Sequence, residues 1–148
     1  MIKDILKITG KLHITLYDKN HNIKQQVEVP NLVVNDGMNL IANILAGDST
    51  AYITHMAVGT SATAAAGSQS TLISETGRNA LTGYLVTNNV IQYSATFNTG
   101  EGTGELQEAG LFNDGTAGTM LCRTVFDPIN KDVDDILTIN WSVTFNYA

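Results

Sequence analysis

The chain has 148 residues, of which 43% are hydrophobic and 15% are charged, and its net charge is −6. This length suits one domain with its own core, and the composition is too apolar and too weakly charged for a disordered chain. The negative charge argues against binding to nucleic acid, because phosphates would repel it. Apolar runs are only a few residues long, so we expect no membrane span, and the single cysteine excludes a disulfide within the chain.

The first ten residues alternate charged and aliphatic side chains, which is compatible with an N-terminal arm (1–10) or with a first strand. They have no long apolar centre and no small-residue cleavage site, so we expect no secretory signal. Residues 11–18 and 23–29 alternate in the manner of two strands of a hairpin, which Pro30 ends. We therefore expect a single β-rich domain over 11–148, preceded by the possible arm.

One helix is expected at about 35–46. Asn35 or Asp36 is placed to cap its first turn, and apolar residues recur at helical spacing along it. Gly47 suits the left-handed conformation that ends many helices. A helix of this length is marginal alone, so we expect it to pack on a sheet.

The rest of the chain reads as further strands joined by short turns. Strands are expected at 52–58, 81–86, 90–97, 105–112, 119–126 and 136–145, and the last of these has the clearest alternation. Small residues fill 59–71, which we interpret as an exposed loop or an extended arm. The sequence therefore predicts a mainly β fold, an antiparallel β-sandwich or barrel-like domain of seven to nine strands with one short helix.

The sequence contains no spacing typical of a catalytic, cofactor or metal site. The histidines are scattered, and the glycines of 100–104 lack the strand, helix and Lys-Ser/Thr context of a phosphate loop. The acidic cluster at 132–135 could hold a cation such as calcium, but it lacks the glycine and distal glutamate of an EF-hand, which favours a solvated turn. We expect neither an enzyme nor a bound cofactor.

Three residues are candidates for a structural or interaction role in the later strands. Arg123 requires a carboxylate if its side of the strand faces inward, and Glu108 on the preceding strand is the candidate partner. The alternative is an outward Arg123 that lies on the sheet surface. Trp141 is expected in the core because it shares the apolar side of the last strand.

Charge is distributed unevenly along the chain. Residues 1–28 contain five lysines against three acids, whereas residues 101–148 contain two basic and eight acidic residues. Lys3 and Lys7 belong to the basic segment and are the remaining candidates for an interaction. The two segments could meet across a subunit boundary, or they could form two solvated faces.

Four segments, in their order and spacing, resemble a widespread group of small virion proteins of tailed bacteriophages. They are 31–47, 53–60 with its Ala57-Val-Gly-Thr60 end, the Glu108-Ala-Gly-Leu-Phe112 strand, and 121–126. Members of the group are labelled as tail-fibre, tail-collar or head-decoration proteins. The resemblance implies a structural protein of the virion, synthesised in the cytoplasm of a bacterial host, and it supplies no catalytic residue.

Two positions on the particle compete. A capsid decoration protein, which binds and stabilises the assembled capsid, is preferred because 148 residues leave no fibre shaft and no receptor-binding tip. The Glu-x-Gly-Leu-Phe strand, which is associated with fibre attachment, favours a tail-fibre, tail-collar or baseplate connector. The expected partners are copies of the chain, as a homotrimer, and other virion proteins such as the major capsid protein or tail components. Edge strands, the arm and the loops 59–71 and 98–104 would supply the contacts.

A carbohydrate-binding module is the alternative from another class. It would use Trp141, Tyr84 and Tyr93 together with acidic residues. Aromatic residues make up only 7% of the chain and none are adjacent in a platform, which argues against this function.

Overall fold

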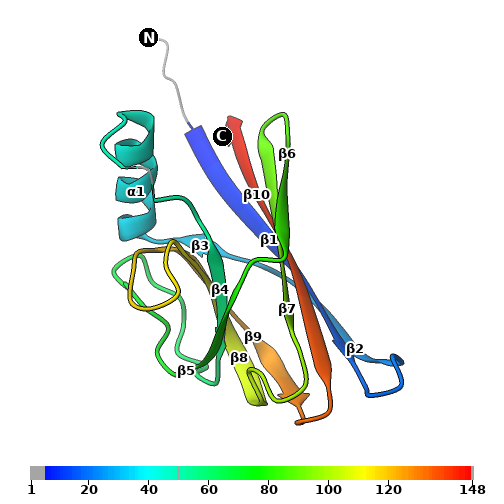
Figure 1. The fold of residues 1–148 in the computed structure, drawn as a ribbon. Helices are drawn as coiled ribbons and strands as arrows, with labels where there is room; N and C mark the ends of the chain where they lie inside the picture. The colour runs from blue at the N-terminus through cyan, green and yellow to red at the C-terminus, as the bar shows by residue number, and fades with distance from the viewer. Residues whose placement is uncertain (1–5, 50, 148) are drawn as a thin grey trace.

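A computed structural model describes residues 6–49 and 51–147, which form a sandwich of two antiparallel five-stranded sheets (Figure 1). The first sheet consists, in spatial order, of β2 (Ile23–Pro30), β1 (Leu6–Tyr17), β10 (Ile136–Tyr147), β7 (Val90–Phe97) and β6 (Gly83–Thr87). The second sheet consists of β3 (Leu32–Val33), β9 (Met120–Lys131), β8 (Gly104–Phe112), β4 (His55–Gly59) and β5 (Glu75–Ala80). The helix α1 (Asn35–Leu45) follows β3. The predicted fold class is confirmed. The described residues form ten strands instead of seven to nine, because β3 and β5 add to the eight segments with a strand pattern. β3 has only two residues, and β5 has no clear alternation in the sequence.

The core lies between the sheets and follows the alternation in the sequence. Neighbouring β1 and β10 place their apolar residues opposite one another, as in the pairs Leu12–Trp141 and Ile14–Ile139. Such side chains occupy one face of a strand because successive residues point to opposite faces. All four of these residues are buried in the main core, as the sequence predicts for β10.

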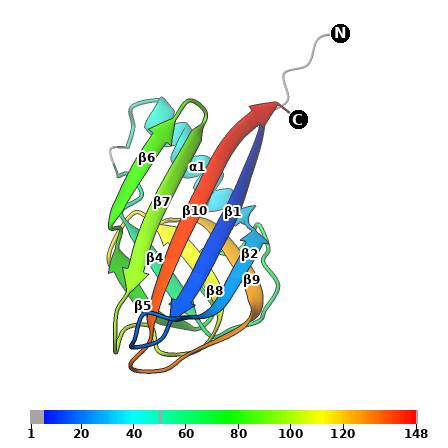
Figure 2. The ribbon, with the colours of Figure 1, turned by 90° about the vertical axis from the view of Figure 1, so that its right-hand side faces the viewer.

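The two sheets do not cover each other completely. β1 and β10 run the full height of the first sheet, whereas the second sheet lies opposite only its lower part (Figures 1 and 2). At the upper end, α1 lies opposite the first sheet instead. Phe145, near the end of β10, is accordingly only partly buried.

The N-terminal segment was open to two interpretations, an arm or a strand. Its described part, residues 6–10, is the first half of β1 and pairs with β10 from Leu6–Tyr147 onward. Residues 1–5, which include Lys3, lie outside the described residues. The hairpin predicted over 11–29 is confirmed as β1 and β2.

The helix has the predicted extent but not the predicted cap. Val34 occupies the N-cap position without a side-chain hydrogen bond. The backbone N–H of Asn35 instead donates to the carbonyl of Gly67, at 2.8 Å, so a distant loop satisfies this donor. Gly47 follows the helix with a φ of 77°, as expected of a C′ glycine. The part of the chain that the structure describes contains no helix long and apolar enough to cross a membrane.

β9 continues past the point where the sequence predicted its end. The strand was expected to end at 126, yet β9 runs through Pro128 to Lys131. The register between β8 and β9 shifts here, from Glu108–Val125 to Leu106–Ile129. Proline is tolerated in such an irregular stretch because the ladder does not require its missing N–H.

Candidate functional site

The predicted ion pair forms on the face of the second sheet that points away from the main core. Glu108 on β8 and Arg123 on β9 have no exposed surface, and Arg123 Nε donates to Glu108 Oε1 at 3.3 Å. Arg123 Nη2 lies 3.2 Å from the same oxygen, but it has no hydrogen-bond partner of good geometry among the described residues. Arg123 thus lies on the outer face of the sheet, but it is not on the protein surface, because the loop between β4 and β5 covers it.

This ion pair holds the loop between β4 and β5 against the sheet. Glu108 Oε1 accepts the backbone N–H of Ile73 at 2.8 Å, and Oε2 accepts those of Ser74 and Ser61 at 2.9 and 3.0 Å. Arg123 Nη1 donates to the carbonyl of Thr63 at 2.8 Å. Burying both charges is tolerable because each is paired and also hydrogen-bonded to the loop.

Most residues of the loop are exposed, as its small residues predicted, but hydrogen bonds tether it to the sheet. Its two ends are fixed by Glu108, and Gln69 in its middle both accepts from Arg123 and donates to the carbonyl of Ala64. Beneath the loop lies a second apolar cluster that includes Leu72 and Phe112. The small residues allow close packing on the sheet, and the ion pair thus has a structural role in this fold.

Trp141 is buried, as predicted. Its indole Nε1 donates to the side-chain oxygen of Asn31 at 3.1 Å. Asn31 is fixed in turn by its backbone N–H, which donates to the carbonyl of Gly10. Trp141 is thus a hydrogen-bonded core residue.

Charges from the two ends of the chain meet within one subunit. Lys24 Nζ lies 2.8 Å from Asp135 and 3.6 Å from Asp132. Burial opposes the ionisation of Asp135, but the hydrogen bonds from Lys24 and from the Asp132 N–H outweigh it and hold its pKa below the ordinary value. Lys7, the other basic candidate, is exposed on β1. The acidic cluster is therefore a turn that forms ion pairs with Lys24. The described residues contain no group of His, Cys, Asp or Glu that could hold a metal.

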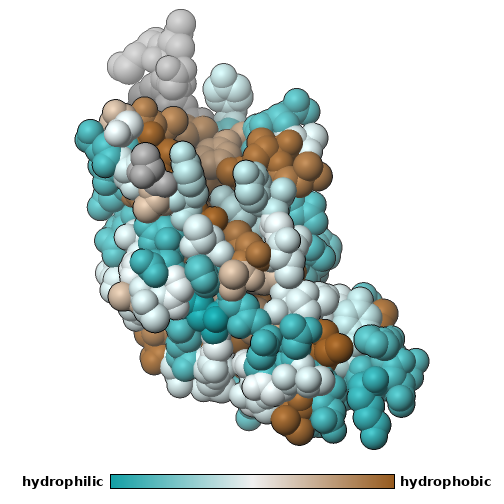
Figure 3. Space-filling model, viewed as in Figure 1, coloured by the Kyte–Doolittle hydropathy of each residue, from teal (hydrophilic) through white to brown (hydrophobic). Residues whose placement is uncertain are grey.

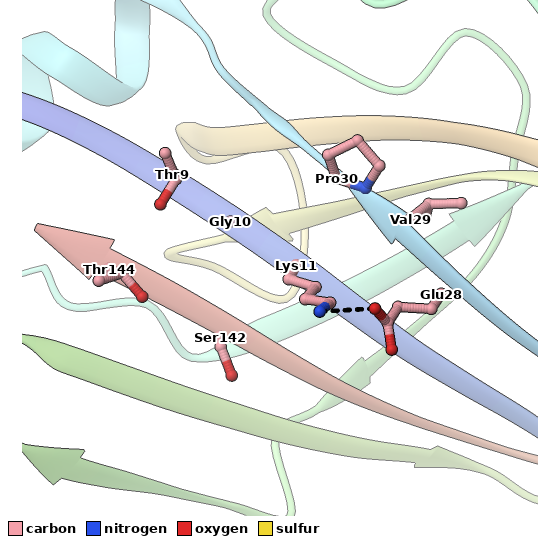
Figure 4. A pocket seen from close by; sticks show the side chains of 8 residues that line it. All are labelled: Thr9, Gly10, Lys11, Glu28, Val29, Pro30, Ser142 and Thr144. Carbon is pink, nitrogen blue, oxygen red and sulfur yellow. Dashed lines mark ion pairs between the residues drawn. The ribbon is translucent and has the colours of Figure 1, made fainter. Parts of the chain in front are cut away.

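A depression of about 400 Å³ lies on the outer face of the first sheet. Figure 4 shows Lys11 and Glu28 pointing toward each other there, with Ser142 and Thr144 beside them. The Lys11 ammonium, 2.6 Å away, lowers the pKa of Glu28. Ion-paired and hydroxyl groups of this kind can form hydrogen bonds to a polar ligand, but the lining offers no aromatic ring on which a sugar could stack.

A groove with a mainly apolar lining lies between α1 and the upper end of the first sheet, and we call it the apolar groove. It has a volume of about 360 Å³ and is lined by Leu6, Leu40, Ile41, Ile44, Leu45, Tyr52, Ile53, Ile91, Tyr93, Leu121, Val143 and Phe145. Hydrophobic residues gather at this end of the molecule, over α1 and over β6 (Figure 3). Burial of Tyr93 in the lining of the apolar groove raises its pKa to about 12.

The sequence did not identify the apolar groove, although one signal was present. The short helix has five large apolar residues. A single contact with a sheet cannot bury all of them. In the structure only Gly37 and Leu40 of α1 are buried, and Leu45 remains largely exposed. The excess of apolar residues on α1 is what lines the groove.

The three aromatic residues considered for sugar binding lie side by side on β10, β7 and β6, as the pairs Trp141–Tyr93 and Tyr93–Tyr84, but they do not form an exposed platform. Trp141 is fully buried, Tyr93 is 8% exposed, and only Tyr84 is widely exposed.

Comparisons with protein-family models, with curated proteins and with solved structures found no match to this chain.

Proposed function

We propose that this protein is a structural component of a tailed-phage virion, a decoration protein that binds the assembled capsid and stabilises it. Its partners are copies of itself and virion proteins such as the major capsid protein, and it is synthesised in the cytoplasm of the host bacterium. The observation that carries the proposal is the apolar groove with the exposed apolar residues around it. The resemblance of four sequence segments to small virion proteins of tailed bacteriophages indicates which kind of particle the protein would bind.

The apolar groove supports an attachment role because contiguous apolar surface is unfavourable in water. Its burial against another molecule is favourable. Leu45 and Tyr52, on its rim, are 83% and 65% exposed.

Stabilisation follows from mass action. A protein that binds the assembled shell, and not its separated subunits, shifts the equilibrium toward the shell by RT ln(1 + [L]/Kd) at each position. At a free concentration of about 100 times Kd this amounts to about 2.7 kcal/mol for each site. No reaction at a catalytic centre is required.

The structure offers less support for the connector alternative. The Glu108–Phe112 segment, whose resemblance to fibre attachment domains favoured that function, is internal: Glu108, Leu111 and Phe112 have no exposed surface. Its residues serve the fold of the second sheet and do not present a contact to a fibre.

The proposal is tested with virions of the encoding phage that lack this protein. Purified protein is added back, and bound protein and the melting temperature of the shell are measured. We expect saturable binding and a higher melting temperature with the wild type, and a loss of both with Leu45→Lys. A lysine near the end of α1 is compatible with the helix dipole, so this variant should fold. Ile23→Lys, at an exposed apolar residue of β2 outside the groove lining, is the matched control and should bind normally.

Three results would contradict the proposal. Shells that bind no wild-type protein exclude decoration. Intact shells that lack fibres until the protein is restored indicate the connector, and binding to a glycan array that Tyr84→Ala abolishes indicates a carbohydrate-binding module.

A further inference from the structure

β6 differs from the other three strands that end a sheet. The two sheets end in β2 and β6, and in β3 and β5. β2 carries Lys24 and Glu28 and finishes in a proline, β5 carries the ion-paired Glu75 and Arg78, and β3 has only two residues. Charge, proline and shortness are the usual devices that stop an edge from pairing with another chain.

β6 has none of these devices. Its sequence, Gly83-Tyr-Leu-Val-Thr87, contains no charged residue and no proline, and its register with β7 shows no bulge. All five residues are exposed, with Tyr84, Leu85 and Val86 at 71%, 62% and 57%. An edge of this kind presents unpaired backbone groups beside apolar side chains and is a template for strand addition.

We propose that β6 is a dimerisation edge, and that its partner is β6 of a second copy of this chain, paired antiparallel about a two-fold axis. This inference deepens the proposed function by naming the surface through which copies associate. A strand placed antiparallel to its own copy is self-complementary, because each backbone donor on one copy meets the equivalent acceptor on the other. With no charge on the strand, this contact brings no like charges together.

If Leu85 lies on the two-fold axis, all five residues of β6 pair with β6 of the second copy. This register sets Tyr84 opposite Val86 of the second copy, and Gly83 opposite Thr87 of the second copy. Aromatic side chains opposite β-branched ones are among the favourable cross-strand pairs, each contributing about 0.2–1 kcal/mol. The first sheets of the two copies become one ten-stranded sheet.

The apolar surface on the inner side of β6 is continuous with the apolar groove. Tyr84 and Val86 pair across the ladder with Tyr93 and Ile91, both of which line the groove. Cross-strand partners point to the same face, so Tyr84 and Val86 extend the groove to the edge of the sheet. A two-fold axis perpendicular to the sheet places the grooves of both copies on one side, where a single larger surface can meet them together. This geometry gives a dimer and not the homotrimer expected from the sequence.

The mass of the purified protein in solution tests the inference directly. Light scattering coupled to gel filtration is expected to give twice the mass of one chain for the wild type and the mass of one chain for Val86→Lys. Val133→Lys is the matched control, since Val133 is 59% exposed in the turn before β10 and undergoes the same change. Circular dichroism and thermal melting of both variants establish that they fold.

A cross-link tests the register and also detects a weak dimer. Residues opposite each other in antiparallel strands have Cα atoms about 4.5–5.5 Å apart, within the range that a disulfide spans. Oxidation of the Leu85→Cys variant is expected to give a covalent dimer. The native Cys122 is buried and should not take part in the cross-link. Val133→Cys should not cross-link under the same conditions.

A monomer at every concentration without a cross-link, a trimer, or a dimer that Val86→Lys leaves intact would each overturn the inference. Failure here is distinguishable from failure of the proposed function, because these measurements involve no particle. A β6 dimer that binds no capsid refutes only the decoration role, and a monomer that binds capsids refutes only the dimer.

Discussion

Replacing Glu108 with glutamine should remove a large part of the stability of the fold, although the two side chains have nearly the same shape. The carboxylate accepts three backbone N–H groups and lies against Arg123, with no exposed surface. In Glu108→Gln one acceptor oxygen becomes an NH₂ group. If the retained oxygen stays with Ile73, the NH₂ group faces the N–H groups of Ser61 and Ser74.

The structure sets the expected magnitude. Each buried donor left without an acceptor costs about 1–3 kcal/mol. Breaking a buried ion pair on one side costs about 3–5 kcal/mol, because the other charge remains buried. The two terms overlap, since both arise from losing one carboxylate oxygen, and part of the loop can regain contact with water. We expect Glu108→Gln to lower the free energy of unfolding by about 3–5 kcal/mol, a large part of the 5–15 kcal/mol typical of a domain.

The assay is urea unfolding followed by the fluorescence of Trp141, the single tryptophan of the chain, which is buried. Hydrogen exchange provides an independent measurement, because the amides of Ser61 and Ser74, which lose their acceptor, should lose their protection first. Glu105→Gln, at an exposed position of the same strand, is the control and should change stability by less than about 0.5 kcal/mol.

Arg123→Met distinguishes the roles of the two partners. It leaves Glu108 with its three backbone donors, so it should cost less than Glu108→Gln, and the double variant should cost less than the sum of the two. A loss below about 1 kcal/mol for Glu108→Gln, with the Ser61 and Ser74 amides still protected, would refute the view that this ion pair fixes the loop.

Two further predictions concern stability. Asp135→Asn removes the partner of Lys24. Because the pKa of Asp135 is lower in the folded chain than in the unfolded one, its ionised form stabilises the fold above about pH 4, and this contribution is lost as the pH falls through the folded pKa. Unfolding curves should therefore show Asp135→Asn less stable than the wild type at pH 7 and equal to it in strong acid; an equal difference at both pH values would contradict the prediction. Gly37→Ala should lower stability by about 1–3 kcal/mol in thermal or urea unfolding, because its added Cβ would overlap the backbone carbonyl of Leu121. Gly83→Ala, which has open space around it, is the control, and equal effects of the two alanines would count against the close contact of α1 with β9.

Local patterns predicted the parts of the fold that depend on neighbours in sequence. The alternation of β10 followed from a side-chain period of two, and the helix end at Gly47 from the ease with which glycine adopts a positive φ. The Glu108–Arg123 pair was also predictable, because the two residues lie on consecutive strands and a buried arginine needs a carboxylate.

The features that matter most for function depend on which segments meet across the fold. The sequence predicted an exposed loop over 59–71 but not that it is tethered, because the charged groups that hold it come from β8 and β9. The first backbone N–H of α1 donates to the carbonyl of Gly67 and not to a side chain of the helix. β9 continues through Pro128 because its register with β8 shifts at this point.

The sequence by itself thus determined the strands, the helix and the paired charges, since these follow from periodicity along the chain and from the high cost of burying a lone charge. Only the tertiary structure decided that β6 would end a sheet and that α1 would stand where the second sheet stops. The apolar groove and the free edge result from the order of strands, which depends on packing between residues distant in sequence and leaves no local pattern.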